Sequence, residues 1–351
     1  MNNRTIVKSN MASVDRTSYQ RGVLPTASYP KGDRRGCRIS FILGNTNLSF
    51  MTMSIETAPG PSTVPPGFTS DADFGRWRES KLSLHPLRAE SLWVEVANPH
   101  QPTAAEVSAI RERCRQFNMA LYASHQPIAD GARLREFGRH IGLHALDPNP
   151  FAGNDGVAHI QVASEAIAGE YIPYTTRGIR WHTDGYYNKT ERQIRGLIMH
   201  CVAPAQAGGI NRLLDPDILF AQLWDLDPKH VRALMQPDAL TIPENAGPGP
   251  AQRPARTGPV FSIVEGRRLH MRYTARTRSV RWLDDPQIDA ARGALEALIT
   301  EISTEAIQIR LEANQGLVCN NVLHDRSAFD DDGGARLMLR ARYLQRVPAP
   351  D

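Results

Sequence analysis

The chain has 351 residues, 41% of them apolar and 22% charged, which is the composition of a globular protein with a sizeable core. Its four cysteines are scattered without a C-x-x-C pair, which argues against a cysteine-based zinc site and a disulfide framework. The net charge is +4, yet residues 1–40 alone carry eight Lys or Arg and two Asp or Glu, a net +6. The basic charge therefore belongs to the N-terminal tail.

These features predict the location and partners of the protein. Basic helices and zinc-finger spacings do not accompany the basic tail, so we expect no nucleic-acid partner. Apolar runs fall well short of the ~20 residues that span a bilayer, so we expect no membrane partner. The sequence predicts a cytoplasmic protein that binds a small molecule and leaves a homo-oligomer open.

Residues 1–66 contain few apolar repeats and much Ser, Thr, Asn, Gly and Pro. The stretch TAPGPSTVPPG, residues 57–67, has the composition of a linker. We therefore predict a disordered N-terminal extension and linker over 1–66 and a single domain over 67–351.

Helical and strand signals follow this linker. Thr103 and Glu106 have the spacing of a capping box, and apolar residues at helical spacing continue to Phe117. The stretch MALYAS, residues 119–124, predicts a strand, and residues 131–141 predict a second helix.

From residue 156 onward the pattern favours strands. Short apolar runs are bounded by turn residues: VAHIQVA, IRGLIMHCVA, PVFSIV, RLHMRYT, AIQIRLE, GLVCNNVLH and LMLRARYLQRV. Glu265-Gly266 and Asn314-Gln315-Gly316 predict hairpin turns, and Asp215-Pro216 and Asp285-Pro286 predict helix starts. The expected fold class is mainly β with helical decoration, an antiparallel sandwich or barrel.

The stretch RWHTDGYYN, residues 180–188, contains the pattern H-x-D at His182 and Asp184. In an extended segment these two side chains lie on one face and can reach one ion. His324 is the candidate third ligand, because it ends the apolar run GLVCNNVLH and precedes a polar loop. Two His and one carboxylate are the facial triad of non-haem Fe(II) oxygenases, with positions left open for a 2-oxo acid and O2.

Arg336 and Arg340 share one face of the strand ARLMLRARYL, and a guanidinium can grip the far carboxylate of such a 2-oxo acid. Each element has a structural alternative. A lone His on a strand is often structural, and the Arg residues could form the solvated face of an edge strand. The order of H-x-D, strand-end His and then Arg favours the functional interpretation.

With these residues the sequence resembles the TauD/TfdA-like family of Fe(II)- and 2-oxoglutarate-dependent dioxygenases, over roughly residues 160–347. The resemblance implies a double-stranded β-helix, or jelly roll, with His182, Asp184 and His324 as iron ligands. It also implies 2-oxoglutarate binding by Arg336, accompanied by Arg340. The stretch AGGINRLLD matches the family's Gly-Gly-x-Thr pattern, with Asn211 where Thr is usual.

The implied activity hydroxylates or oxidatively cleaves a small polar molecule, while 2-oxoglutarate and O2 yield succinate and CO2. The segment YTTRGIRWHTD is similar to the γ-butyrobetaine hydroxylase group, in which Tyr174 matches an aromatic-cage residue. Tyr174, Trp181 and Tyr186 are therefore candidate substrate contacts for a cationic group, although the nearby arginines Arg177 and Arg180 favour an anion. A zinc-dependent hydrolase and a non-catalytic β-helix protein that binds a small acid remain alternatives.

Residues 1–50 lack a core-forming pattern, so we expect them to be dispensable for folding and activity. A chain that begins at Met51 should match the full chain in thermal midpoint and in 2-oxoglutarate turnover. Loss of solubility or of turnover would contradict this prediction.

Overall fold

The computed structural model describes residues 64–148, 151–162, 171–246, 252–276, 280–331 and 335–351, all within one compact unit, Pro59–Asp351. Most of the predicted extension over residues 1–66 lies outside the described residues. None of the helices in these ranges combines the length and the apolar character that a membrane span requires.

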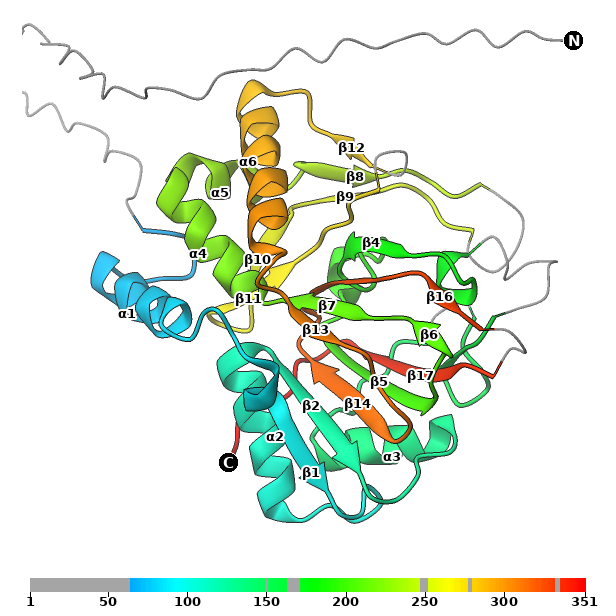
Figure 1. Ribbon diagram of the computed structural model, residues 1–351. Helices are drawn as coiled ribbons and strands as arrows, with labels where there is room; N and C mark the ends of the chain where they lie inside the picture. The colour runs from blue at the N-terminus through cyan, green and yellow to red at the C-terminus, as the bar shows by residue number, and fades with distance from the viewer. Residues whose placement is uncertain (1–63, 149–150, 163–170, 247–251, 277–279, 332–334) are drawn as a thin grey trace, which may run out of the picture. The chain divides into compact units, whose positions relative to one another are not determined.

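Two sheets form the centre of the fold (Figure 1). The larger has six strands in the order β1-β2-β14-β5-β17-β3, in which only β1 and β2 are parallel. Its strands are β1 Trp93–Val96, β2 Met119–Ser124, β3 Ala158–Ile160, β5 Gly196–Ala203, β14 Gln315–Cys319 and β17 Leu337–Tyr343. The smaller sheet has four antiparallel strands in the order β13-β7-β15-β4. These are β4 Ile179–His182, β7 Asn211–Leu214, β13 Ile307–Ile309 and β15 Leu323–Arg326.

A hydrophobic cluster joins the two sheets. It contains Leu197, Leu317 and Met338 from the larger sheet together with Leu213 and Ile307 from the smaller one. Because apolar side chains from both sheets pack against each other, the sheets form a sandwich. The predicted mainly β, jelly-roll architecture with added helices is confirmed. A short ladder of β6 Ala207–Gly208 and β16 Phe329–Asp330 lies beside it.

Helices α2 (Ala104–Phe117) and α3 (Gly131–His140) cover the outer face of the larger sheet (Figure 1). The predicted capping box is present: the Glu106 amide donates to Thr103 Oγ1 at 3.2 Å, and the Thr103 amide donates to Glu106 Oε2 at 2.6 Å. Ile110 and Cys114 then face the sheet and are fully buried. The cap starts the helix, and the apolar stripe fixes which side it buries.

Four further helices pack with the small strands around a second cluster, which also includes Trp181 and Leu323 from the smaller sheet. They are α1 Asp71–Leu82, α4 Pro216–Leu226, α5 Pro228–Leu234 and α6 Pro286–Ile302. The small strands are β8 Leu240–Ile242, β9 Arg256–Gly258, β10 Phe261–Val264, β11 Arg268–Met271 and β12 Arg281–Trp282. As predicted, Asp215 and Asp285 cap the helices α4 and α6, with Pro as the first helical residue.

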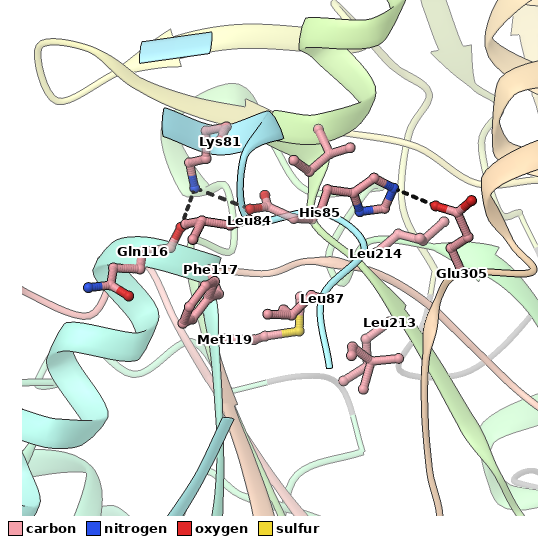
Figure 2. A pocket seen from close by; sticks show the side chains of 13 residues that line it. Lys81, Leu84, His85, Leu87, Gln116, Phe117, Met119, Leu213, Leu214 and Glu305 are labelled. Atoms are coloured by element: carbon pink, nitrogen blue, oxygen red, sulfur yellow. Dashed lines mark hydrogen bonds and ion pairs between the residues drawn. The ribbon is translucent and has the colours of Figure 1, made fainter. Parts of the chain in front are cut away.

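The end of α1 meets the start of α4 at a small cavity of about 30 Å³, shown in Figure 2. Lys81 is buried, with 8% of the residue exposed. Its ammonium group donates to the Gln116 backbone carbonyl at 2.8 Å and lies 2.8 Å from the Asp217 carboxylate and 3.1 Å from that of Asp215. A buried cation needs such partners to offset the loss of water. The cavity can hold only about one water molecule, so we assign the Lys81 contacts a structural role and not a ligand-binding one.

Two expectations about the chain between residues 306 and 324 were wrong. The run GLVCNNVLH is not one strand: it divides into β14 and β15, which belong to different sheets. The break lies at Asn320-Asn321, where Asn321 adopts a left-handed backbone with φ 56°. The turn before Gln315 likewise joins β13 and β14 of different sheets, so it is not a hairpin. The Glu265-Gly266 turn does form the β10–β11 hairpin.

Candidate active site

The pairing of β15 with β4 brings two of the predicted ligands together. His324 lies directly opposite His182 in the register, and their ring centroids are 4.3 Å apart. On the other side of β4, His182 pairs with Thr274 and the Ala275 amide donates to the Trp181 carbonyl. His324 does not end its strand, as the sequence suggested, but is the second residue of β15.

Both imidazoles are oriented by the backbone. Nδ1 of His182 donates to the Arg180 carbonyl at 2.9 Å, and Nδ1 of His324 donates to the Val322 carbonyl at 2.8 Å. Nε2 of each ring is therefore the nitrogen left available to a metal, which binds imidazole in its neutral form. Burial, reinforced by the charge of a protonated His324, lowers the pKa of His182 to about 3. The neutral form of His182 thus dominates at physiological pH.

Asp184 follows β4 at the start of a turn. The turn depends on Gly185, whose φ is 65° and where a Cβ would come within 2.4 Å of the Ile194 side chain. Burial by itself would raise the pKa of Asp184, but Arg340 and its other cationic neighbours lower it to about 2. Oδ1 accepts a hydrogen bond from Arg340 at 3.1 Å, whereas the buried Oδ2 has no protein partner among the described residues.

The three predicted ligands do not form a complete coordination set. Within the described ranges, no group of three His, Cys, Asp or Glu side chains meets the geometry of a metal site. The two imidazoles adjoin, but one oxygen of Asp184 is engaged by Arg340. Binding of one ion by all three side chains therefore stays a prediction.

Arg336 lies immediately before β17 and is 5% exposed. Its guanidinium stacks on the Phe329 ring at 4.5 Å, and the Arg326 guanidinium lies at 4.7 Å from the same ring. Burial lowers the pKa of Arg336, and its buried Nη1 has no hydrogen-bond partner in the described part of the chain. A buried cationic donor without an acceptor is costly, so this position is suited to an anionic ligand.

Arg336 and Asn211 line a cavity of about 10 Å³ together with Gly208 and Gly209. Gly208 has φ 74°, and a Cβ there would come within 2.3 Å of the Ala328 carbonyl, which explains the Gly-Gly pair of AGGINRLLD. The cavity has room for about one water, so a larger ligand requires the surrounding side chains to shift. Arg340 shares a face of β17 with Arg336 but lines a different, larger cavity.

This larger cavity has a volume of about 650 Å³ and is lined by His182 and Asp184. Its size is typical of small-molecule sites. The sequence candidates Tyr174 and Tyr186 line it, whereas Trp181 does not: its side chain, 9% exposed, packs in the hydrophobic cluster with α4, and Arg212 stacks on its ring. Trp181 therefore lies on the opposite face of β4 from His182, as strand alternation requires.

The cavity lining is strongly cationic. It contains eight Arg or Lys side chains and three carboxylates. The cations are Arg180, Lys189, Arg192, Arg253, Arg256, Arg276, Arg340 and Arg342; the carboxylates are Asp147, Asp184 and Glu244. This charge favours the anionic alternative for the substrate over a cationic group.

Sequence reasoning missed Asn321, the residue that holds the Asp184 backbone in place. The side-chain oxygen of Asn321 accepts a hydrogen bond from the Asp184 backbone N–H at 2.7 Å. Its side-chain nitrogen donates to the Asp184 carbonyl at 2.9 Å and to the Ile194 carbonyl at 2.7 Å. A second missed residue is Arg326, which donates to the carbonyls of Thr175 and Arg177 from the last position of β15. An Asn in an apolar run, three residues before the candidate His, was the available signal for Asn321.

Comparison with known proteins places the chain in a family. The family model described as taurine catabolism dioxygenase TauD, TfdA family matches residues 81–342, which include every predicted ligand. The chain belongs to the TauD/TfdA family. The predicted family is thus confirmed, and its description agrees with the predicted dioxygenase class.

Individual relatives add detail. A uridine-5'-phosphate dioxygenase of a Streptomyces species is 30% identical over 179 residues, which is 48% of this chain and 63% of that protein, so the match spans less than two thirds of the relative. A variant of the non-heme iron oxygenase OrfP with bound (3S)-hydroxy-L-Arg has 15% identity and a TM-score of 0.50 over 78% of this chain and 92% of its own. An asparagine oxygenase with Fe(II), hydroxyasparagine and succinate has 13% identity and a TM-score of 0.47 over 79% and 92%. These structural likenesses concern the fold.

Asn321→Gly should weaken metal binding, because it frees the Asp184 backbone while still permitting the left-handed conformation. Leaving buried polar groups unsatisfied should also lower the free energy of unfolding by about 1–3 kcal/mol. The measurements are urea unfolding and Co(II) titration of the metal-free protein.

Asn320→Ala is the matched control for this variant. Its buried side chain bonds Cys114, Asn118 and Val347 but makes no hydrogen bond to Asp184. It should lose comparable stability and keep its Co(II) affinity. Equal Co(II) affinities in wild type, Asn321→Gly and Asn320→Ala would show that Asn321 has only a structural role.

Proposed function

We propose that this protein is an Fe(II)- and 2-oxoglutarate-dependent dioxygenase that hydroxylates or oxidatively cleaves a small polar molecule. The observation that carries the proposal is the position of His182, Asp184 and His324. The imidazoles of His182 and His324 face each other across a strand pair, and His182 and the Asp184 carboxylate line a cavity of substrate size. Family membership supports the same assignment.

The residues fit an iron ion on chemical grounds. The Nδ1 hydrogen bonds leave Nε2 of each imidazole to bind a metal, and the buried Oδ2 of Asp184, which has no hydrogen-bond partner among the described residues, would be its carboxylate ligand. Bound Fe(II) would supply the activation of O2, with 2-oxoglutarate as the source of two electrons and succinate and CO2 as its products. Arg340 would keep the Asp184 carboxylate ionised and oriented through its 3.1 Å contact.

The unpartnered Nη1 of Arg336 supports this residue as the anchor of the distal carboxylate of 2-oxoglutarate. Phe329 holds the guanidinium plane by stacking, which leaves its edge free to grip two oxygens. Asn211 lines the same small cavity and could donate its side-chain amide to that carboxylate. Arg340 would instead pair with the Asp184 carboxylate and line the larger cavity.

The primary substrate would occupy the larger cavity beside His182 and Asp184. Tyr174 and Tyr186 provide aromatic surface there, and Tyr174 Oη is a buried hydroxyl without a partner among the described residues. The relative that acts on uridine 5'-phosphate makes this nucleotide the first compound to test.

His182→Ala, Asp184→Ala and His324→Ala should each abolish 2-oxoglutarate turnover, because each removes one of three ligands. The assay measures succinate formed by Fe(II)-loaded protein with 2-oxoglutarate, and circular dichroism tests that the fold survives. His200→Ala is the control, since His200 is a buried histidine that bonds Tyr122 and lies in the larger sheet. Near-wild-type turnover in His324→Ala would refute the triad. No succinate from the wild type would favour a hydrolase or a binding protein.

Arg336→Ala should raise the KM for 2-oxoglutarate more than tenfold, because loss of a buried charge-assisted contact costs about 2–5 kcal/mol. Arg336→Lys should be intermediate, since Lys keeps the charge but not the two-pronged geometry. Steady-state succinate formation at varied 2-oxoglutarate provides the measurement. An unchanged KM would move the role to Arg340 or Arg342.

A further inference from the structure

Three arginines gather on the side of the large cavity formed by the β8–β9 connection and the segment after β11. Arg253 precedes β9, Arg256 is its first residue, and Arg276 lies two residues beyond Thr274, the bridge partner of His182. All three line the cavity and are half-buried. We call Arg253, Arg256 and Arg276 the arginine cluster.

The arginine cluster lacks a neutralising partner. Among the residues that the structure describes, no ion pair joins any of the three to a carboxylate, and the nearby Glu244 is exposed. Arg253 donates to the Pro243 carbonyl at 2.6 Å, and Arg256 makes one long bond, 3.3 Å, to the Ala255 carbonyl. Three other cavity cations are paired: Arg192 and Arg342 share Asp147, and Arg340 is paired with Asp184. The remaining two, Arg180 and Lys189, are exposed to solvent.

Like charges that are brought together and partly removed from water destabilise each other. Burial lowers the pKa of Arg253, and the positive charge of Arg256 lowers it further, whereas the groups that oppose this fall are tyrosine hydroxyls. Iron and 2-oxoglutarate do not relieve the excess, because their charges of +2 and −2 cancel. An additional anion would balance the charge of the cluster.

We propose that the arginine cluster binds the phosphate group of a phosphate-monoester substrate, an inference that rests on the proposed function of the cavity. A phosphate monoester carries a charge near −2 and three terminal oxygens. Three guanidinium groups from two segments of the chain match three oxygens better than the two of a carboxylate. The rest of the molecule then extends toward His182 and Asp184.

Aromatic side chains shape the path between the arginine cluster and the metal ligands. The ring of Tyr187 lies 5.4 Å from the Arg253 guanidinium and 5.9 Å from that of Arg342, and its hydroxyl accepts a hydrogen bond from Arg342 at 2.8 Å. Tyr186 packs edge-on to Tyr187 and to His182. These rings offer a planar surface for the uncharged part of the substrate.

The test compares binding of uridine 5'-phosphate, inorganic phosphate and uridine to the metal-free full-length protein by isothermal titration calorimetry. The wild type should bind uridine 5'-phosphate at least tenfold more tightly than uridine, with inorganic phosphate as a competitor. Arg256→Gln and Arg276→Gln should remove that preference. Because neither side chain makes an ion pair among the described residues, both variants should fold; Arg253→Gln is a third variant.

Arg88→Gln is the control, since Arg88 has a side chain that is 84% exposed and lies outside the cavity lining. It makes the same charge change and should keep the wild-type preference. The proposal is overturned if neither uridine 5'-phosphate nor inorganic phosphate binds, or if uridine binds as tightly as uridine 5'-phosphate. It is also overturned if the Arg256 and Arg276 variants keep the preference for uridine 5'-phosphate.

Succinate formation from 2-oxoglutarate by the Fe(II)-loaded protein is measured in parallel. Turnover of 2-oxoglutarate without a phosphate preference would overturn the arginine-cluster proposal and leave the dioxygenase assignment intact. A phosphate preference without any turnover would instead separate anion binding from the proposed catalytic function.

Discussion

The site depends first on the pairing of β15 with β4. This pairing sets His324 opposite His182, and carbonyls two residues earlier in the chain, at Arg180 and Val322, orient both rings. The third predicted ligand, Asp184, is fixed to the same unit by one side-chain amide, because Asn321 forms hydrogen bonds with both the N–H and the carbonyl of Asp184. Side chains from two distant segments of the sequence thus share one short hydrogen-bonded framework.

The sequence predicted the elements whose signals are local. The capping box at Thr103, the Asp-Pro starts of α4 and α6 and the β10–β11 turn all depend on residues within one or two turns of chain, and all are present. The H-x-D pattern, the later His and the Arg pair were recognisable because their types and order carry the chemistry. Their convergence on one ion remains a prediction, since Asp184 contacts Arg340 in the structure.

Features that depend on packing could not be predicted in the same way. In GLVCNNVLH only Asn320-Asn321 interrupts the apolar pattern, and two polar residues do not by themselves indicate that the next strand joins another sheet. The aromatic residues around His182 suggested a cage, but strand alternation turns Trp181 into the core. Arg336 and Arg340 share a strand face yet line different cavities. Sequence spacing predicts on which face of a strand a side chain lies. The elements packed against that face determine which cavity the side chain lines.

The passage from β14 to β15 is short: β14 ends at Cys319, β15 begins at Leu323, and the two strands belong to different sheets. Within β15 the side chains alternate: Leu323 packs with the helices outside, and Asp325 pairs with Arg212, while His324 faces His182. An insertion or deletion of one residue here would present Leu or Asp to His182 and turn the imidazole away. This segment is therefore a point of low tolerance to length variation, where evolution of the protein can change side chains but not residue count.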